Sequence, residues 1–266
     1  ILLFFINYRF ITKNFNYYYL LIFLYLIYIS FSTKGHPDFE WYHLPYMNYL
    51  KDFKIIFGIA NINDFLAFAQ NWNDILSILR LPIFDFNTSN IISGVFLCLF
   101  FIFLSDSIKK ETNTTLKIFL LLILIFCIAK YHKIYEFSGH APPTILGFII
   151  LFYIIKLSLE NYKKNSIKNT IFKILILFSF VPMLRINYIV LIPSVLYIFY
   201  YNRNTFISIL ISNRMIIFIF FVPLILLSKN LIMSGCLFYP IYWTCLPVEY
   251  LSWGVSPEFT KDRYDI

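Results

Sequence analysis

Charged residues are scarce in this chain. Only 14% of its 266 residues are Asp, Glu, Lys or Arg, whereas 60% are hydrophobic. Soluble domains have roughly 25% charged residues, and a globule of this length could not bury so much apolar surface. The low charge and the mean hydropathy of +0.73 therefore exclude a soluble fold and indicate an integral membrane protein.

Cysteine is rare as well. Cys98, Cys127, Cys236 and Cys245 follow no metal-ligand spacing and are too sparse to form a disulfide scaffold. We therefore do not expect them to organise the fold, although Cys236 and Cys245 can pair if their segment faces an oxidising compartment. The sequence also lacks an initial Met. It opens with the apolar stub ILLFFIN, which is too short to cross a bilayer, so we expect a fragment of a longer chain.

Long hydrophobic runs are what the sequence does have. About 20 apolar residues span a bilayer, and fewer are needed when flanking Lys, Arg, Tyr and Trp reach the interface. Such runs predict spans near residues 17–33, 90–105, 115–130, 143–159, 171–185, 187–201 and 213–229. The expected fold class is all-α: a polytopic transmembrane bundle of about seven spans in a single domain, 1–266. Alternatively, Pro182 and Pro193 kink the fifth and sixth runs into one re-entrant hairpin.

The distribution of Lys and Arg predicts the orientation. Placing residues 7–16 in the cytoplasm gives that side a large excess of basic over acidic residues, as the positive-inside rule requires. Its basic residues are Arg9, Lys13, Lys109, Lys110, Lys117, Lys156, Lys163, Lys164, Lys168, Lys173, Arg203 and Arg214. Segments 34–89 and 230–266 are then external. The basic pI of about 9.2 reflects topology and contact with anionic membrane lipids, and gives no reason to invoke nucleic acid.

The first external loop concentrates ionisable side chains just after a span. Asp38 and Glu40 lie two residues apart, with His36 and His43 on either side. On an extended segment both carboxylates project to one side, as a general base and its partner or a metal pair would require. The alternative is that an interfacial loop simply keeps these polar groups in water. Residues 46–79 alternate apolar and polar groups, which predicts one or two amphipathic helices on the outer leaflet.

Several motifs resemble one protein family. They are D-x-x-x-Y-H-L-P-Y at 38–46, K-I-I-x-G-x-A-N at 54–61, Trp72, S-G-H-A-P-P at 138–143, R-I-N-Y at 185–188, and N-L-I-M-S-G at 230–235 with Tyr239 and Pro240. Together they resemble a family of large bacterial polytopic membrane proteins similar in layout to the C-type glycosyltransferases. The motifs cover most of the chain.

The resemblance implies an external catalytic cavity in a bacterial cytoplasmic (inner) membrane protein. There a sugar would pass from a polyprenyl-phosphate carrier to a surface glycan, lipid or protein acceptor. Asp38 matches the catalytic base, and Glu40 is the adjacent acid. A second-loop acid of some relatives has no clear counterpart, Glu136 being the nearest. We therefore predict no obligatory metal or other cofactor, although Asp38 and Glu40 could hold a divalent cation.

Candidate substrate-binding residues follow from the charge of the leaving phosphate, which cations at the outer boundary would stabilise. They are His43, Arg185, His132, Lys133 and His140. Each has a plainer interpretation: Arg185 and Lys133 flank spans, and the histidines are interfacial hydrogen-bonding groups. The aromatic segment after residue 229 forms either an acceptor groove or an interfacial belt.

Two other classes of protein compete with a glycosyltransferase. A transporter or flippase for a lipid-linked glycan should place ionisable groups at mid-membrane, and the predicted span interiors are almost free of them. A non-catalytic assembly subunit would be indifferent to loss of the first-loop acids.

Overall fold

The structure, a computed structural model, describes residues 20, 23–25, 27–28, 39–53, 56–67, 71–78, 87–131, 139–159, 164–212 and 216–264. Within these ranges every regular element is a helix, which confirms the predicted all-α class. The chain divides into two compact units, one formed by 1–35 and 80–136, the other by 36–79 and 137–266. The single domain expected over 1–266 stays a prediction.

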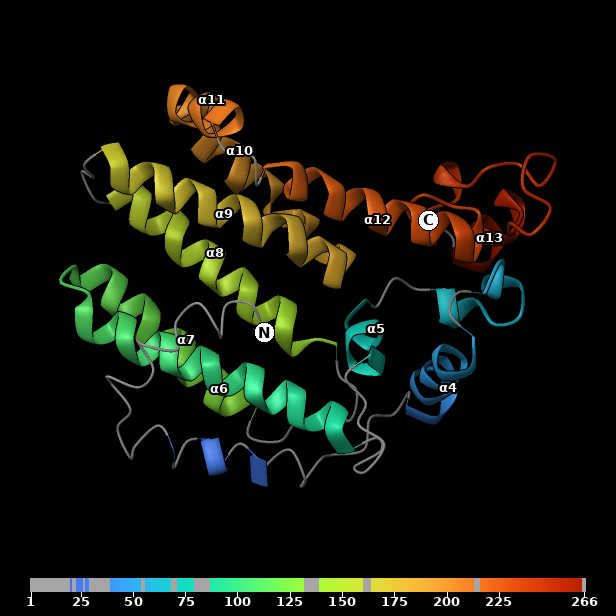
Figure 1. The fold of residues 1–266 in the computed structure, drawn as a ribbon, viewed down its shortest axis with the longest axis horizontal. Helices are drawn as coiled ribbons and strands as arrows, with labels where there is room; N and C mark the ends of the chain where they lie inside the picture. The colour runs from blue at the N-terminus through green and yellow to red at the C-terminus, as the bar shows by residue number, and fades with distance from the viewer. Residues whose placement is uncertain are drawn as a thin grey trace. The chain divides into compact units, whose positions relative to one another are not determined.

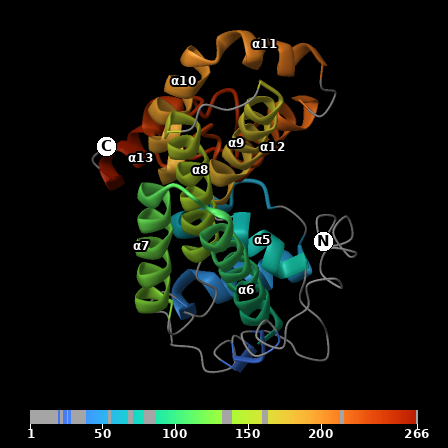
Figure 2. The ribbon, with the colours of Figure 1, turned by 90° about the vertical axis from the view of Figure 1, so that its left-hand side faces the viewer.

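The first unit contains a helical hairpin of α6 (Asn87–Lys110) and α7 (Thr114–Lys130), seen side by side in Figure 1 and Figure 2. Side chains in the turn satisfy the free backbone N–H groups. The Glu111 carboxylate accepts from the N–H groups of Thr112 and Asn113, and the Asn113 side chain accepts from those of Thr115 and Leu116. This is an N-cap of the kind that short polar side chains supply.

One face of α7 is buried and the other is apolar but exposed. The buried stripe recurs at helical spacing, while large hydrophobic residues on other faces remain uncovered. The buried residues are Leu116, Leu120, Ile123 and Cys127, and the exposed ones include Ile118, Leu122, Ile125 and Ile128. A helix that is apolar all round is suited to lipid rather than to water.

The second unit is built on α8 (Ala141–Leu159), α9 (Lys164–Leu184) and α12 (Ile216–Ser234), with α9 packed against both others (Figure 1). Between α9 and α12 the chain forms a 3-10 helix, η4 (Ile186–Leu191), then α10 (Ile192–Tyr201) and α11 (Arg203–Ser212). Pro193 stands in the first turn of α10, where its missing N–H costs no helical hydrogen bond.

Specific contacts show which helix ends lie together. The Thr144 and Tyr188 hydroxyls are 2.5 Å apart, so the start of α8 meets the start of η4. Asn71 bonds both the Met183 carbonyl, near the end of α9, and Lys229, near the end of α12. At the opposite end a buried cluster contains Ile154 of α8, Ile171 of α9, Ile198 of α10 and Ile209 of α11. The η4–α10 segment therefore leads back along the bundle.

Three helices are long and apolar enough to cross a membrane: Ile91–Lys110, Ala141–Leu159 and Ile167–Leu184. They correspond to the predicted spans 90–105, 143–159 and 171–185. Shorter apolar helices cover Asn187–Tyr201 and Ile219–Ser234, and α7 has 17 residues. Most of the predicted span 17–33 lies outside the described residues. The total of seven spans stays a prediction.

Two boundaries differ from the sequence prediction. Residues 203–212 form a helix, although Arg203 and Arg214 suggested only a cytoplasmic turn. The last apolar helix continues to Ser234, past the predicted end at 229, so Asn230 lies inside α12 instead of after it. A lysine therefore did not mark the end of the helix, because in the structure its ammonium group has partners on neighbouring elements.

The two segments predicted to be external pack on each other, and we call them together the cap: residues 39–78 and 235–264. The first contributes η1 (Phe39–His43, a π-helix), α4 (Leu44–Asp52), η2 (Ile59–Asn61), η3 (Asp64–Ala67) and α5 (Asn71–Ile78). The second contributes η5 (Tyr242–Thr244), α13 (Pro257–Tyr264) and a Cys236–Cys245 disulfide. The sequence predicts one or two amphipathic helices within 46–79, and the described part of that range does contain helices, whereas their place on the outer leaflet stays a prediction.

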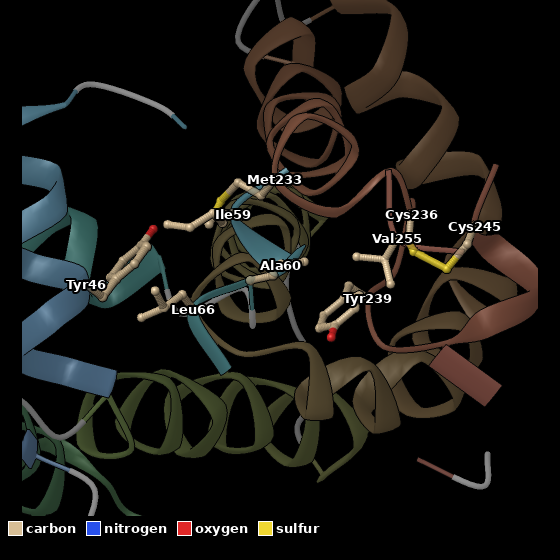
Figure 3. Close-up of a cluster of buried hydrophobic side chains, with 10 residues drawn as sticks. Tyr46, Ile59, Ala60, Leu66, Met233, Cys236, Tyr239, Cys245 and Val255 are labelled. Carbon is tan, nitrogen blue, oxygen red and sulfur yellow. A yellow bond between two sulfur atoms is a disulfide. The ribbon is translucent and has the colours of Figure 1, made fainter. Parts of the chain in front are cut away.

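A shared hydrophobic core joins the cap to the end of α12 (Figure 3). Its buried residues come from both segments and from α12: Tyr46, Ile59, Ala60, Leu66, Ala67, Met233, Cys236, Tyr239, Cys245 and Val255. Polar contacts connect the same three parts. The Gly58 N–H donates to the Ile232 carbonyl, the Asn61 amide to the Trp253 carbonyl at 2.7 Å, and Arg263 pairs with Asp64 at 3.0 Å.

Two glycines permit the close approach of these segments. Gly58 and Gly235 have φ of +62° and +78°, a region that L side chains rarely adopt. A Cβ atom on Gly58 would lie 2.4 Å from the Trp253 carbonyl oxygen, and one on Gly235 would lie 2.7 Å from the Gly254 Cα. Both belong to the motifs K-I-I-x-G-x-A-N and N-L-I-M-S-G, so these motifs encode backbone contacts within the cap.

Candidate functional site

The predicted site residues differ in where the structure places them. Asp38, His132 and Lys133 lie outside the described residues, as does Glu136. Glu40 is exposed in η1, and His140 is exposed in the turn that precedes α8. His43 and Arg185 belong to the same end of the second unit, one in the first-loop helices and the other directly after α9.

Arg185 is held at the break between two helices. It is the last residue before η4, with an extended backbone, and its side chain is half-buried. Burial lowers the pKa of its guanidinium, whereas Tyr188 and Tyr42 act in the opposite direction. Arginine nevertheless remains protonated at neutral pH. Within the part of the chain that the structure describes, no carboxylate forms an ion pair with Arg185.

This environment makes Arg185 a candidate anion-binding residue. A half-buried guanidinium offers five N–H donors in a planar fork that matches phosphate oxygens. Tyr42 contributes a neighbouring phenol from η1, and Tyr188 contributes another from η4. The Tyr188 hydroxyl is also held by Thr144. Tyr42 follows Asp38, the predicted base, by four residues in the sequence.

His43 is buried, with only 3% of its surface exposed. Its Nδ1 atom lies 3.0 Å from the Asn73 side-chain amide nitrogen. When that amide donates, Nδ1 accepts, and the neutral ring carries its proton on Nε2. This contact connects η1 to α5. The geometry therefore supports a structural role for His43 at least as directly as it supports the predicted contact with a substrate.

A second polar group of residues surrounds Lys229. The ammonium donates to the Asp74 carboxylate and, at 2.6 Å, to the Asn71 side-chain oxygen, and it lies 5.6 Å from the centre of the Tyr46 ring. The Tyr46 hydroxyl donates to the other Asp74 oxygen at 2.7 Å. The Asn71 amide donates to the Met183 carbonyl at 2.6 Å. We call Tyr46, Asn71, Asp74 and Lys229 the polar node.

A small cavity adjoins the polar node. Its volume of about 20 Å³ suits about one water molecule and is too small for a sugar. The lining is apolar apart from Lys229 and the tyrosine hydroxyls, and consists of Tyr46, Tyr49, Leu50, Phe53, Ile56, Ile59, Lys229 and Met233. This cavity is therefore not the predicted substrate cavity in its present form.

Metal ligands are not clustered in the described ranges, where no group of three or more His, Cys, Asp or Glu side chains could hold an ion. Asp38 is not among these residues. A cation bound by Asp38 and Glu40 thus stays untested, as does the expectation that no metal is obligatory.

One protein-family model matches residues 2–264, which is almost the whole chain, and its description is a domain of unknown function (DUF8201). The chain belongs to the DUF8201 family. No curated protein and no solved structure matches it. The family description names no activity, so the resemblance to C-type glycosyltransferases enters only as a proposal.

Sequence reasoning missed the polar node of this DUF8201 chain. Asn71 and Asp74 counted only as the polar side of an amphipathic segment, and Lys229 only as the last residue of a predicted span. One signal was present: N-W-N-D at 71–74 places three polar side chains in one turn, and Trp72 is buried with them. The partner of Asp74 is 155 residues away, and no local pattern can identify it.

Proposed function

We propose that this protein is a membrane glycosyltransferase of the C type, with its active site on the external face of a bacterial cytoplasmic membrane. The donor would be a sugar on a polyprenyl-phosphate carrier, and the acceptor a surface glycan, lipid or protein. The proposal rests on the order and spacing of the sequence motifs and on the environment of one residue, Arg185.

The observation that carries the proposal is a half-buried cation without a carboxylate partner in the described part of the chain. Arg185 stands at the end of α9, beside aromatic residues of two separate motifs, Tyr42 and Tyr188. Desolvating a charge is costly unless an opposite charge compensates it. A lipid phosphate would provide that compensation, because its oxygens match the guanidinium fork and its chain remains in the bilayer.

Asp38 would act as general base in this scheme. It takes the proton of the acceptor hydroxyl while the acceptor oxygen forms a bond to the anomeric carbon. The bond between that carbon and the phosphate oxygen breaks through an oxocarbenium-like state. The phosphate leaves with the bonding electrons, and Arg185 stabilises its charge in a partly dry environment. Glu40, which is exposed, would be a neighbouring acid without a direct role in bond breaking.

Ion-coupled transport is the less favoured alternative. A transporter driven by protons or cations needs carboxylates within the membrane. Helices α8, α9 and α12 contain no Asp or Glu in their sequences. The acids that the structure describes in the second unit occur instead in the cap, among them Glu40, Asp64, Asp74 and Glu258.

The test is complementation by the full-length protein carrying Arg185→Gln or Asp38→Asn. Each change should lower glycan synthesis by about 100-fold at normal protein level, because each removes a group that acts on the transition state. In the purified protein, Arg185→Gln should also weaken binding of farnesyl phosphate, a short carrier analogue, whereas Asp38→Asn should retain that binding.

Arg203→Gln is the matched control, since Arg203 begins α11 at the opposite end of the bundle. It should leave synthesis and binding unchanged. Normal glycan synthesis by Arg185→Gln or by Asp38→Asn would contradict the proposed chemistry.

A further inference from the structure

The polar node joins four helices at one point. Tyr46 belongs to α4, Asn71 and Asp74 to α5, and Lys229 to α12, while the Met183 carbonyl belongs to the last turn of α9. These elements are far apart in the sequence: Asn71 is 112 residues from Met183, and Asp74 is 155 residues from Lys229. The node is therefore a tertiary junction and not a local cap of one helix.

The charges in the node are compensated within it. Both Asp74 oxygens accept hydrogen bonds, one from Lys229 and the other from Tyr46. The Lys229 ammonium has two oxygen partners and one ring face, and its side chain is only 13% exposed. A buried ion pair adds little net stability compared with apolar residues of similar size, but it favours one arrangement of its elements.

Two connections lead from the node to Arg185. Met183, whose carbonyl receives the Asn71 amide, precedes Arg185 by two residues. Tyr46 follows Tyr42 by four residues, and η1 continues directly into α4. The node thus holds both the chain that carries Arg185 and the helix that carries its neighbour Tyr42.

The other contacts of α4 with α12 are less directional. They surround the small apolar cavity, with Tyr49, Leu50 and Phe53 on the first-loop side and Met233 on α12. Apolar burial is favourable without fixing orientation. The hydrogen-bonded ion pair of Lys229 and Asp74 fixes the orientation of the helices, which these apolar contacts do not.

We propose that Lys229 and Asp74 are positioning residues, whose ion pair sets the first-loop helices over Arg185 and so forms the phosphate site without touching the phosphate. This inference rests on the proposed function. In this view the ion pair fixes the geometry of the phosphate site. A variant that loses the pair should therefore bind phosphate more weakly even if it still folds.

The test uses the purified full-length chain with both charges removed, Lys229→Met with Asp74→Leu. This double variant leaves no unpaired charge, so the protein should still fold, with a melting temperature lowered only by loss of the Tyr46 hydrogen bond to Asp74. Its affinity for farnesyl phosphate should fall about tenfold, since misplacement by about 1 Å can cost more than that. Inorganic phosphate, tested in parallel, distinguishes a general phosphate site from one that requires a lipid chain.

Further variants keep the proposal falsifiable if the double variant does not fold. Tyr46→Phe removes one hydroxyl and leaves the ion pair, and it should weaken binding by about threefold. The exchange Lys229→Asp with Asp74→Lys should recover part of the affinity. Lys261→Met, which removes an exposed cation from the cap, should have no effect.

The outcomes separate this inference from the proposed function. Parental affinity in a folded double variant, or in Tyr46→Phe, would overturn the positioning role while Arg185→Gln still lost binding. Parental affinity in Arg185→Gln would instead remove the phosphate site, and the positioning role with it.

Discussion

At the scale of single residues, the cap contains polar side chains that are buried. His43, Asn71 and Asn73 are all nearly inaccessible; His43 and Asn73 contact each other, and the Asn71 amide donates to the Met183 carbonyl of α9. Composition predicted an interfacial loop here, because isolated polar residues suggested exposure to water. Their burial could not be predicted, since the hydrogen-bond partners come from distant segments.

Ionisation of the Tyr46 phenol makes the folding stability of the chain depend on pH. Burial raises the pKa of its phenol well above 10, and the adjacent Asp74 carboxylate adds to this effect. The folded chain therefore holds this proton more tightly than the unfolded chain. The contribution of Tyr46 is fully present below about pH 10 and is lost as the pH rises through the raised value, at up to about 1.4 kcal/mol per pH unit.

Tyr46→Phe should reduce this loss. We expect lower stability than the parent at pH 8, because a hydrogen bond to Asp74 is missing, but a smaller decline between pH 10 and pH 11. Thermal unfolding in detergent across this range measures both effects. Tyr250→Phe, at a position 76% exposed, should follow the parental curve. Parallel curves for Tyr46→Phe and the parent would contradict the burial of an ionisable phenol.

At the scale of elements, apolar runs predicted where helices occur better than where they end. The spans at 143–159 and 171–185 fall on α8 and α9 because each is a long run with basic residues at its start or end. The run at 187–201 instead divides into η4 and α10 next to Pro193, and α12 continues past Lys229. Hydropathy does not register a buried ion pair, so it ended the last helix too early.

The loop after α12 is closed by several interactions at once. The Cys236–Cys245 disulfide spans it, Thr244 accepts from the Phe238 N–H, and the Asn230 amide donates to the Leu237 carbonyl. The sequence predicted this pairing only conditionally. Replacing both cysteines with serine should destabilise the protein by about 2–3 kcal/mol, as expected for a closed loop of this length.

Chemical unfolding of the double serine variant, compared with the reduced and oxidised parent, measures this cost. The reduced parent should resemble the variant. Serine in place of the two buried thiols Cys98 and Cys127 serves as control, because that variant should respond to a reductant as the parent does. Equal stability of the oxidised parent and the Cys236/Cys245 variant would exclude a stabilising role for the disulfide.

At the scale of the whole molecule, the second unit combines helices with the cap, and in its described residues the two ends differ in charge. One end carries basic residues, among them Lys156, Lys168, Lys173 and Arg203, while the cap has both signs of charge and the disulfide. The positive-inside rule and the preference of disulfides for oxidising compartments both favour an external cap. The sequence predicted this orientation from charge alone, and the disulfide is an independent argument for it.

Labelling of single cysteines tests the orientation. Tyr250→Cys, in the cap, should react with a membrane-impermeant maleimide on intact cells, whereas Tyr201→Cys, at the end of α10, should react only after permeabilisation. Native cysteines should contribute little, because two are buried and two form the disulfide. Labelling of Tyr201→Cys alone on intact cells would reverse the assignment.

The pairing of early and late segments in the cap also has a consequence for biosynthesis. Asn61 meets Trp253 only after another 192 residues have been made, which takes the ribosome roughly 10–40 s. During that interval Ile59, Leu66 and Tyr46 have no late segment to cover them. We therefore expect the core of the cap to be completed only after the C-terminal segment has been made.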